Sequence, residues 1–114
     1  MIAVIFEVEP HPEQHGAYLD HAGTMGSTLE EIDGFISVER FESLTQPGKL
    51  LSLSFWRDEA AIDDWRRLER HRAAQAKGRT AYFRDYRLRV AGVIRDYGMT
   101  ERDQAPADSV SIHG

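Results

Sequence analysis

The sequence predicts an α+β domain of the ferredoxin-like type, with a four-stranded antiparallel sheet built in the order β-α-β-β-α-β. Two stretches carry apolar residues at helical spacing, and four have the alternation or the β-branched and aromatic side chains typical of strands. The chain has 114 residues, 41% hydrophobic and 29% charged, as expected of one globular domain. In this order both helices would cover the same face of the sheet.

Two prolines separate the first strand from the first helix. Residues 2–8 are rich in β-branched and aromatic side chains and predict a strand, and Pro10 and Pro12 mark a break after it. Beyond Pro12, helical spacing predicts one buried stripe formed by Tyr18, Ala22, Met25, Leu29 and Ile32. Gly34 is expected to end this helix, because glycine accepts the left-handed conformation common after helix C-termini.

The next two strands form a predicted hairpin. Residues 35–42 alternate in character, and residues 50–56 follow after the polar loop 45–49. Simple alternation divides the first of these strands into two faces, one with Phe35, Ser37, Glu39 and Phe41 and the other with Ile36, Val38, Arg40 and Glu42.

The second helix is expected to begin after Asp58, a good N-cap residue, with Ala61, Ile62, Trp65 and Leu68 on one side. Residues 82–97 predict the last strand. We therefore expect a domain over residues 1–97. The polar, proline-interrupted residues 98–114 are interpreted as a C-terminal extension.

The sheet face opposite the helices also carries apolar residues and needs cover. A second copy packing sheet against sheet would supply it and would shelter the edge of the last strand. We therefore predict a homodimer.

Composition excludes several classes of function. The chain has no cysteine, which rules out disulfides, thiolate zinc sites, iron–sulfur clusters and a cysteine nucleophile. A net charge of −5 argues against nucleic acid as a partner. The apolar runs are too short to cross a membrane, and the strand-like amino terminus lacks a basic signal-peptide region, so we expect no membrane partner and a cytoplasmic location.

Recognised cofactor motifs are also missing. There is no Gly-x-Gly-x-x-Gly, no Walker-type phosphate loop and no Gly-x-Ser-x-Gly elbow. His11, His15 and His21 invite a metal interpretation. Pro12 leaves His11 before the helix, however, and no carboxylate ligand stands at a defined spacing, so we interpret these histidines as surface residues and predict no metal site.

Several fragments resemble the antibiotic biosynthesis monooxygenase domain family over about residues 2 to 97. They are Gly34-Phe35, Glu39-Arg40-Phe41, the stretch from Trp56 to Trp65, His71-Arg-Ala-Ala-Gln75 and Tyr86-Arg-Leu-Arg-Val90. The resemblance implies ferredoxin-like subunits that pair as a dimeric α+β barrel. It also implies a range of activities: cofactor-independent oxygenation of anthrones and quinols, haem degradation, and other roles.

Within that family, the haem-degrading branch is similar to this chain at Trp65, which matches its cavity tryptophan. That branch places its haem-ligating histidine ten residues later, where this chain has Gln75, and it uses a strand-one asparagine, a residue type absent here. An amide is a poorer iron ligand than imidazole. Haem degradation would therefore require non-standard ligation, with His71 one helical turn earlier.

The resemblance favours a monooxygenase that acts on an aromatic or quinol-like small molecule without a bound cofactor. His71 is the candidate catalytic base, because an unperturbed histidine pKa of about 6.5 lies near working pH. Trp65, Arg72, Gln75 and Tyr82 are the candidate substrate-binding residues.

Structural roles are the alternative for three of these residues. His71 could cap a helical segment, Trp65 could be ordinary core beside Ile62 and Leu68, and Tyr82 could belong to a dimer interface. A dimeric ligand-binding or accessory protein without catalysis is the corresponding alternative function.

Overall fold

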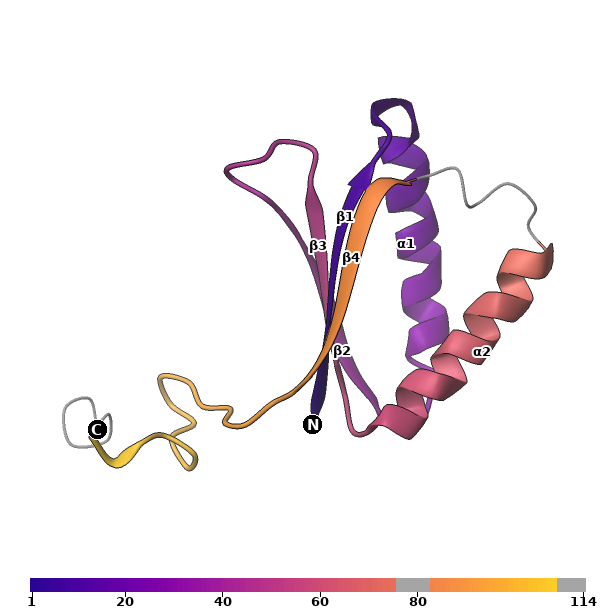
Figure 1. Ribbon diagram of the computed structural model, residues 1–114. Helices are drawn as coiled ribbons and strands as arrows, with labels where there is room; N and C mark the ends of the chain where they lie inside the picture. Colours follow the sequence, from indigo (N-terminus) through magenta and orange to yellow (C-terminus); the bar gives the residue numbers. More distant parts are fainter. Residues whose placement is uncertain (76–82, 109–114) are drawn as a thin grey trace.

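The computed structural model confirms the predicted α+β architecture (Figure 1). It describes residues 1–75 and 83–108, and within the helices it describes no side chains at 21, 24–27 and 69–75. The elements are β1 (Ile2–Pro10), a 3₁₀ turn (Pro12–Gln14), α1 (His15–Leu29), β2 (Phe35–Glu42), β3 (Leu50–Trp56), α2 (Glu59–Gln75) and β4 (Phe83–Gly92).

The four strands form one antiparallel sheet in the order β2-β3-β1-β4, with both helices on one side of it (Figure 1). Register fixes which side chains share the helix-facing side. One row across the sheet joins Val38, Ser54, Val4 and Val90, and the next joins Arg40, Ser52, Phe6 and Leu88.

The core on the helix side consists of two apolar clusters. Cluster A contains Val4, Leu29, Trp56, Ala61 and Ile62, with Ile2, Ile32, Phe35, Val38 and Trp65 packed against it. Cluster B contains Val8, Tyr18 and Leu50, with Phe6 and Phe83 packed against it. Cluster A joins the start of α2 to the sheet, whereas cluster B joins the start of α1 to the sheet.

The faces of β2 differ from the prediction at its first residue. The register shifts between Phe35 and Ser37, so Phe35 pairs with Trp56 and packs into cluster A, whereas Ile36 is 53% exposed. A bulge of this kind inserts one residue and reverses the alternation locally. Phe35 therefore shares the helix-facing side with Val38 and Arg40, and the predicted grouping of Phe35 with Glu39 and Phe41 is wrong.

The ends of three elements also differ from the prediction. α1 begins at His15, behind a 3₁₀ turn that contains Pro12, and ends at Leu29, so Ile32 lies beyond it. β1 runs to Pro10 because Glu9 and Pro10 still pair with β4, beyond the pair of Val8 with Leu50 at the start of β3. β4 ends at Gly92, which pairs with Ile2, the first residue of β1; one further bond joins the Val93 N–H to the Met1 carbonyl.

The connection after α1 is bonded to the connection after β3, and we call this contact the Gly34 junction. Gly34 has φ +94°, and its carbonyl accepts a hydrogen bond of 2.7 Å from the Arg57 N–H. The Arg57 guanidinium forms two hydrogen bonds with the Asp33 carboxylate. Beneath Gly34 lies Ala61, in the first turn of α2, so close that only glycine fits. The junction fixes where α2 starts against the sheet.

The sheet side opposite the helices has an apolar centre. By the strand register, Ile5, Leu53 and Phe55 lie on this side, and Phe41 is 41% exposed there. Glu7 lies on the same side and pairs with Lys49 and Arg89. Residues 93–108 extend away from the domain on this side (Figure 1). No helix in the described ranges is long and apolar enough to span a bilayer.

Candidate functional site

The N-terminal half of α2 presents an aromatic side chain to the sheet. Asp58 caps the helix, because its Oδ1 accepts a hydrogen bond of 3.0 Å from the Ala61 N–H. This bond, followed by the contact with the Arg57 guanidinium, lowers the pKa of the Asp58 carboxyl. From that start the helical repeat places Ala61, Ile62 and Trp65 on the sheet side, where all three join cluster A.

The two tryptophans lie against each other in this layer. Their ring centroids are 6.1 Å apart, with the ring planes tilted by 51°. Trp56 is fully buried, and its indole N–H donates to the Ser54 hydroxyl at 2.9 Å. Trp65 is only partly buried as a residue, yet its Nε1 is inaccessible to solvent and has no hydrogen-bond partner among the described residues. Trp56 is therefore a core residue whose N–H is hydrogen-bonded, whereas the buried N–H of Trp65 has no partner in the part of the chain that the structure describes.

A second free donor comes from β2. The Nε of Arg40 is buried and has no partner in the described part of the chain. Burial raises the pKa of the Tyr18 hydroxyl, and both the charge of Arg40 and a hydrogen bond from its guanidinium act in the opposite direction. Arg40 thus contacts Tyr18 across the space between β2 and α1. Buried polar groups are normally hydrogen-bonded, so an unpartnered guanidinium N–H calls for an explanation.

These polar groups lie between the two apolar clusters. The row of the sheet that contains Arg40 and Ser52 follows the row of Val38 and Ser54, which contributes to cluster A. Tyr18 belongs to cluster B. We call Tyr18, Arg40, Ser52 and the Trp65 indole N–H the polar band. These donors and hydroxyl groups share the helix-facing side of the sheet. Arg40 and Ser52 lie in a row between the two clusters, Tyr18 belongs to cluster B and Trp65 packs against cluster A.

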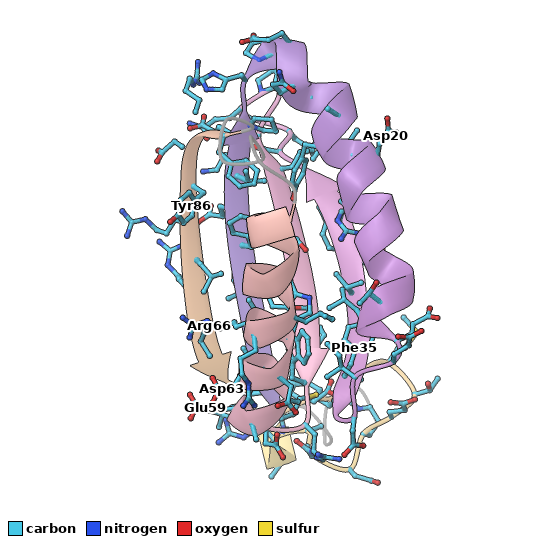
Figure 2. The ribbon with its side chains drawn as sticks, turned by 90° about the vertical axis from the view of Figure 1, so that its right-hand side faces the viewer. Asp20, Phe35, Glu59, Asp63, Arg66 and Tyr86 are labelled. Atoms are coloured by element: carbon cyan, nitrogen blue, oxygen red, sulfur yellow. The ribbon has the colours of Figure 1, made fainter. Side chains whose placement is uncertain are left out.

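β4 adds an apolar strip beside this region. Tyr86, Leu88 and Val90 point to the helix-facing side, and their exposed fractions are 62%, 48% and 47%. Figure 2 shows β4 beside α2 with no helix above it, and Tyr86 near the upper end of the strand. The helix-facing side of the sheet is thus only partly covered by its own helices.

The predicted site residues are not all visible in the structure. Trp65 occupies the helix–sheet interface as predicted. His71, Arg72 and Gln75 belong to the last turns of α2, but their side chains lie outside the described set, and Tyr82 lies outside the described residues altogether. Their roles remain predictions.

The sequence does not predict Arg40 and Tyr18 as site residues. Alternation does place Arg40 on the same strand face as Val38. An arginine on a face with apolar neighbours is the sequence feature that could have indicated a site there. Helical spacing predicts Tyr18 in the buried stripe of the first helix, and Tyr18 is buried, with 5% exposure. Only the fold brings the two residues together.

The histidines near the amino terminus do not form a metal site in the described residues. No group of three potential histidine or carboxylate ligands occurs there. The side chain of His21 lies outside the described set.

Comparison with known proteins assigns the family. Residues 1–77 match the model of the antibiotic biosynthesis monooxygenase family. The chain belongs to this family. Over 93 residues it is 50% identical to the jasmonate monooxygenase ABM of Pyricularia oryzae, an alignment that covers 82% of this chain and 43% of that protein. The chain thus spans less than half the length of this relative.

Solved structures agree on the fold. A Deinococcus radiodurans structure classed with the antibiotic biosynthesis monooxygenases superposes with a TM-score of 0.72 at 15% identity, covering 86% of this chain and 97% of the other. The haem degrader MhuD of Mycobacterium tuberculosis, solved with two haems in its active site, superposes with a TM-score of 0.70 at 13% identity, covering 86% and 100%. At these identities the likeness shows the fold alone.

Proposed function

We propose that this member of the antibiotic biosynthesis monooxygenase family oxygenates an aromatic or quinol-like small molecule without a bound cofactor. The observation that carries the proposal is the helix–sheet interface, where Trp65 presents, beside an aromatic wall, a buried N–H that has no partner among the described residues. An apolar substrate with a few oxygen atoms matches this combination of aromatic surface and isolated donors. The 50% identity to a monooxygenase supports an oxygenase role.

The chemistry requires a base, a protected site and donors for the developing negative charge. We assign the base to His71, whose imidazole would take a proton from an acidic C–H or O–H of the substrate. The resulting carbanion or phenolate is electron-rich enough to reduce dioxygen itself. For a substrate methylene, four electrons pass to dioxygen, one oxygen atom remains as a carbonyl and the other leaves as water. Arg72, Gln75 and Tyr82 are assigned to substrate oxygen atoms.

Oxygen uptake tests this proposal. The substrates are hydroquinones, anthrones and jasmonate, since the relative is named for jasmonate. We expect stoichiometric oxygen consumption with at least one of them, and a loss of about 10²- to 10⁴-fold in His71→Ala. His15→Ala, which removes a histidine from α1, is the matched control and should keep full activity. Unchanged turnover in His71→Ala would reject the base. An inert panel would favour a non-catalytic ligand-binding protein.

Haem titration tests the remaining alternative. The residue at the position of the family's haem ligand is Gln75, so the residues present do not fit the ligation of the haem-degrading branch. We expect no Soret shift at stoichiometric haem. A shift that disappears in His71→Ala would instead indicate ligation by that histidine.

We further propose that the chain is a homodimer through the open side of the sheet. Ile5, Leu53 and Phe55 form the centre of that side, and the ion pairs of Glu7 with Lys49 and Arg89 flank it. A polar rim around an apolar centre is the usual composition of a stable interface. Sedimentation should give about twice the 13.0 kDa of the monomer. The substitution Leu53→Glu should dissociate the particle, whereas a 13.0 kDa species at micromolar wild-type protein would reject the dimer.

A further inference from the structure

Arg40 occupies an unusual position on the helix-facing side of the sheet. Its neighbours in the same row and the row before it are Ser52, Phe6, Val38 and Ser54. Within the described residues no ion pair joins Arg40 to a carboxylate, although six other such pairs occur there. Its Nε is buried without a partner. A guanidinium keeps its charge at every physiological pH, so this positive charge is permanent.

The contact with Tyr18 does not neutralise that charge. The nearby guanidinium opposes the rise in the pKa of Tyr18, but burial still keeps that pKa above its ordinary value, so the hydroxyl stays protonated at neutral pH. A hydroxyl that accepts one hydrogen bond still has its own O–H to donate. Arg40 and Tyr18 together therefore present at least two donors and one positive charge. No carboxylate of the described residues forms an ion pair with this charge.

The Trp65 indole N–H is a third donor on the same side of the sheet, and it points to the same ligand chemistry. It packs against cluster A, as Val38 also does, and Val38 precedes Arg40 by one row of the sheet. A ligand that satisfied all three donors would offer oxygen acceptors and an apolar body. Anionic oxygen is the acceptor that suits a guanidinium best, because charge-assisted hydrogen bonds are shorter and stronger than neutral ones.

We propose that Arg40, supported by Tyr18, binds an anionic oxygen of the substrate while the apolar part of the substrate lies against Trp65. The inference rests on the proposed function, which it narrows to substrates that carry a carboxylate or an ionised phenol. It assigns a specificity role to β2, in addition to the base assigned to α2. Both ligand classes share the same chemistry, and the experiment distinguishes them.

Calorimetric titration with three probes provides the test. 1-Naphthoate carries a carboxylate, its methyl ester lacks the charge, and a nitrophenol studied above and below its own pKa supplies an ionised or a neutral phenol. We expect the wild-type protein to bind naphthoate or the ionised nitrophenol at least tenfold more tightly than the matching neutral form. Equal affinities for the charged and neutral forms of both probes would overturn the proposal, as would a complete absence of binding by all of them.

Arg40→Met keeps the aliphatic stem and removes the charge. We expect it to weaken binding of the anion by about ten- to hundredfold and to leave the neutral form unchanged, as follows from losing one charge-assisted hydrogen bond. Tyr18→Phe should weaken anion binding less. The matched control is Arg67→Met, since Arg67 is an exposed arginine of α2 paired with Asp64, and it should bind like the wild type. Unchanged anion binding by Arg40→Met would refute the assignment.

Two further readings separate failure of this inference from failure of the proposed function. Far-ultraviolet circular dichroism and the melting temperature show whether Arg40→Met is folded, and Arg40→Lys, which retains the charge, should keep part of the affinity if the variant is folded. Oxygen uptake is measured on the same variants. If Arg40→Met leaves turnover unchanged, the role of Arg40 is refuted, but the proposed monooxygenase activity is not. If binding depends on the charge of the ligand but no turnover occurs, the anion-binding role of Arg40 is supported and the proposed monooxygenase activity is refuted.

Discussion

Replacing Gly34 by alanine should destabilise the domain more than the same change at Gly48, although both residues have positive φ. The angles are +94° and +87°. Holding an alanine in this region costs roughly 1–2 kcal/mol at either position. At Gly34 the added Cβ would also lie 2.8 Å from the Ala61 Cβ and 3.3 Å from the Arg57 guanidinium carbon, whereas nothing lies within 4 Å at Gly48. Overpacking of this kind costs about 1–3 kcal/mol.

The expected losses are therefore about 2–5 kcal/mol for Gly34→Ala and about 1–2 kcal/mol for Gly48→Ala. Urea unfolding followed by tryptophan fluorescence measures both, because Trp56 is buried in the folded domain. A second arm repeats Gly34→Ala in an Ala61→Gly background, which removes the atom that the new Cβ would strike. There the penalty should fall towards that of Gly48→Ala. Equal losses for the two glycines, or no coupling between positions 34 and 61, would refute the close-approach argument.

Two further predictions concern the start of α2 and the strand before it. Ser54→Ala removes the acceptor of the Trp56 indole N–H at 2.9 Å and should cost about 1–3 kcal/mol, because a buried donor is left unpaired; Ser52→Ala, on the same strand face, should cost less in the same urea titration. Asp58→Ala should lower the thermal midpoint at neutral pH by removing the helix cap, and Asp58→Asn should restore most of it. The folded-state pKa of Asp58 lies below the ordinary value of 3.8, so the advantage of Asp58 over alanine is present above that pH and should vanish as the pH falls through the folded pKa. If the difference in thermal midpoint between wild type and Asp58→Ala grew as the pH was lowered, the predicted pH dependence would be wrong.

Strand positions could be predicted from the sequence where the pattern is local. β2 and β3 begin and end where alternation and the polar loop place them, at 35–42 and 50–56. The face of Phe35 could not be predicted, because the bulge before Ser37 arises from pairing with β3. The end of β4 depended on its partner as well. Residues beyond Gly92, including Ile94, are as strand-like as those before it, but the pairing with β1 stops at Ile2 and Gly92.

The candidate site could be predicted only in part for a similar reason. Trp65 follows from helical periodicity, which is a local property, and it lies where that periodicity places it. The pairing of Tyr18 with Arg40 joins α1 to β2 across the helix–sheet interface. No short-range spacing relates the two residues. A charged residue on a predicted apolar face is the only sequence feature that could have drawn attention to Arg40, and it needs the sheet register to become specific.

The Gly34 junction has a consequence for how a small molecule could reach the polar band. The junction attaches α2 to the rest of the domain at its first turn, through Gly34, Arg57 and Ala61. Towards its C-terminal end α2 leans away from the sheet (Figure 1). Moving that end outward would widen the separation of helix and sheet without breaking a bond of the junction, whereas moving the first turn would break several. We therefore expect a ligand of the polar band to enter past the C-terminal turns of α2, the part of the helix that carries His71, while the first turn stays in place.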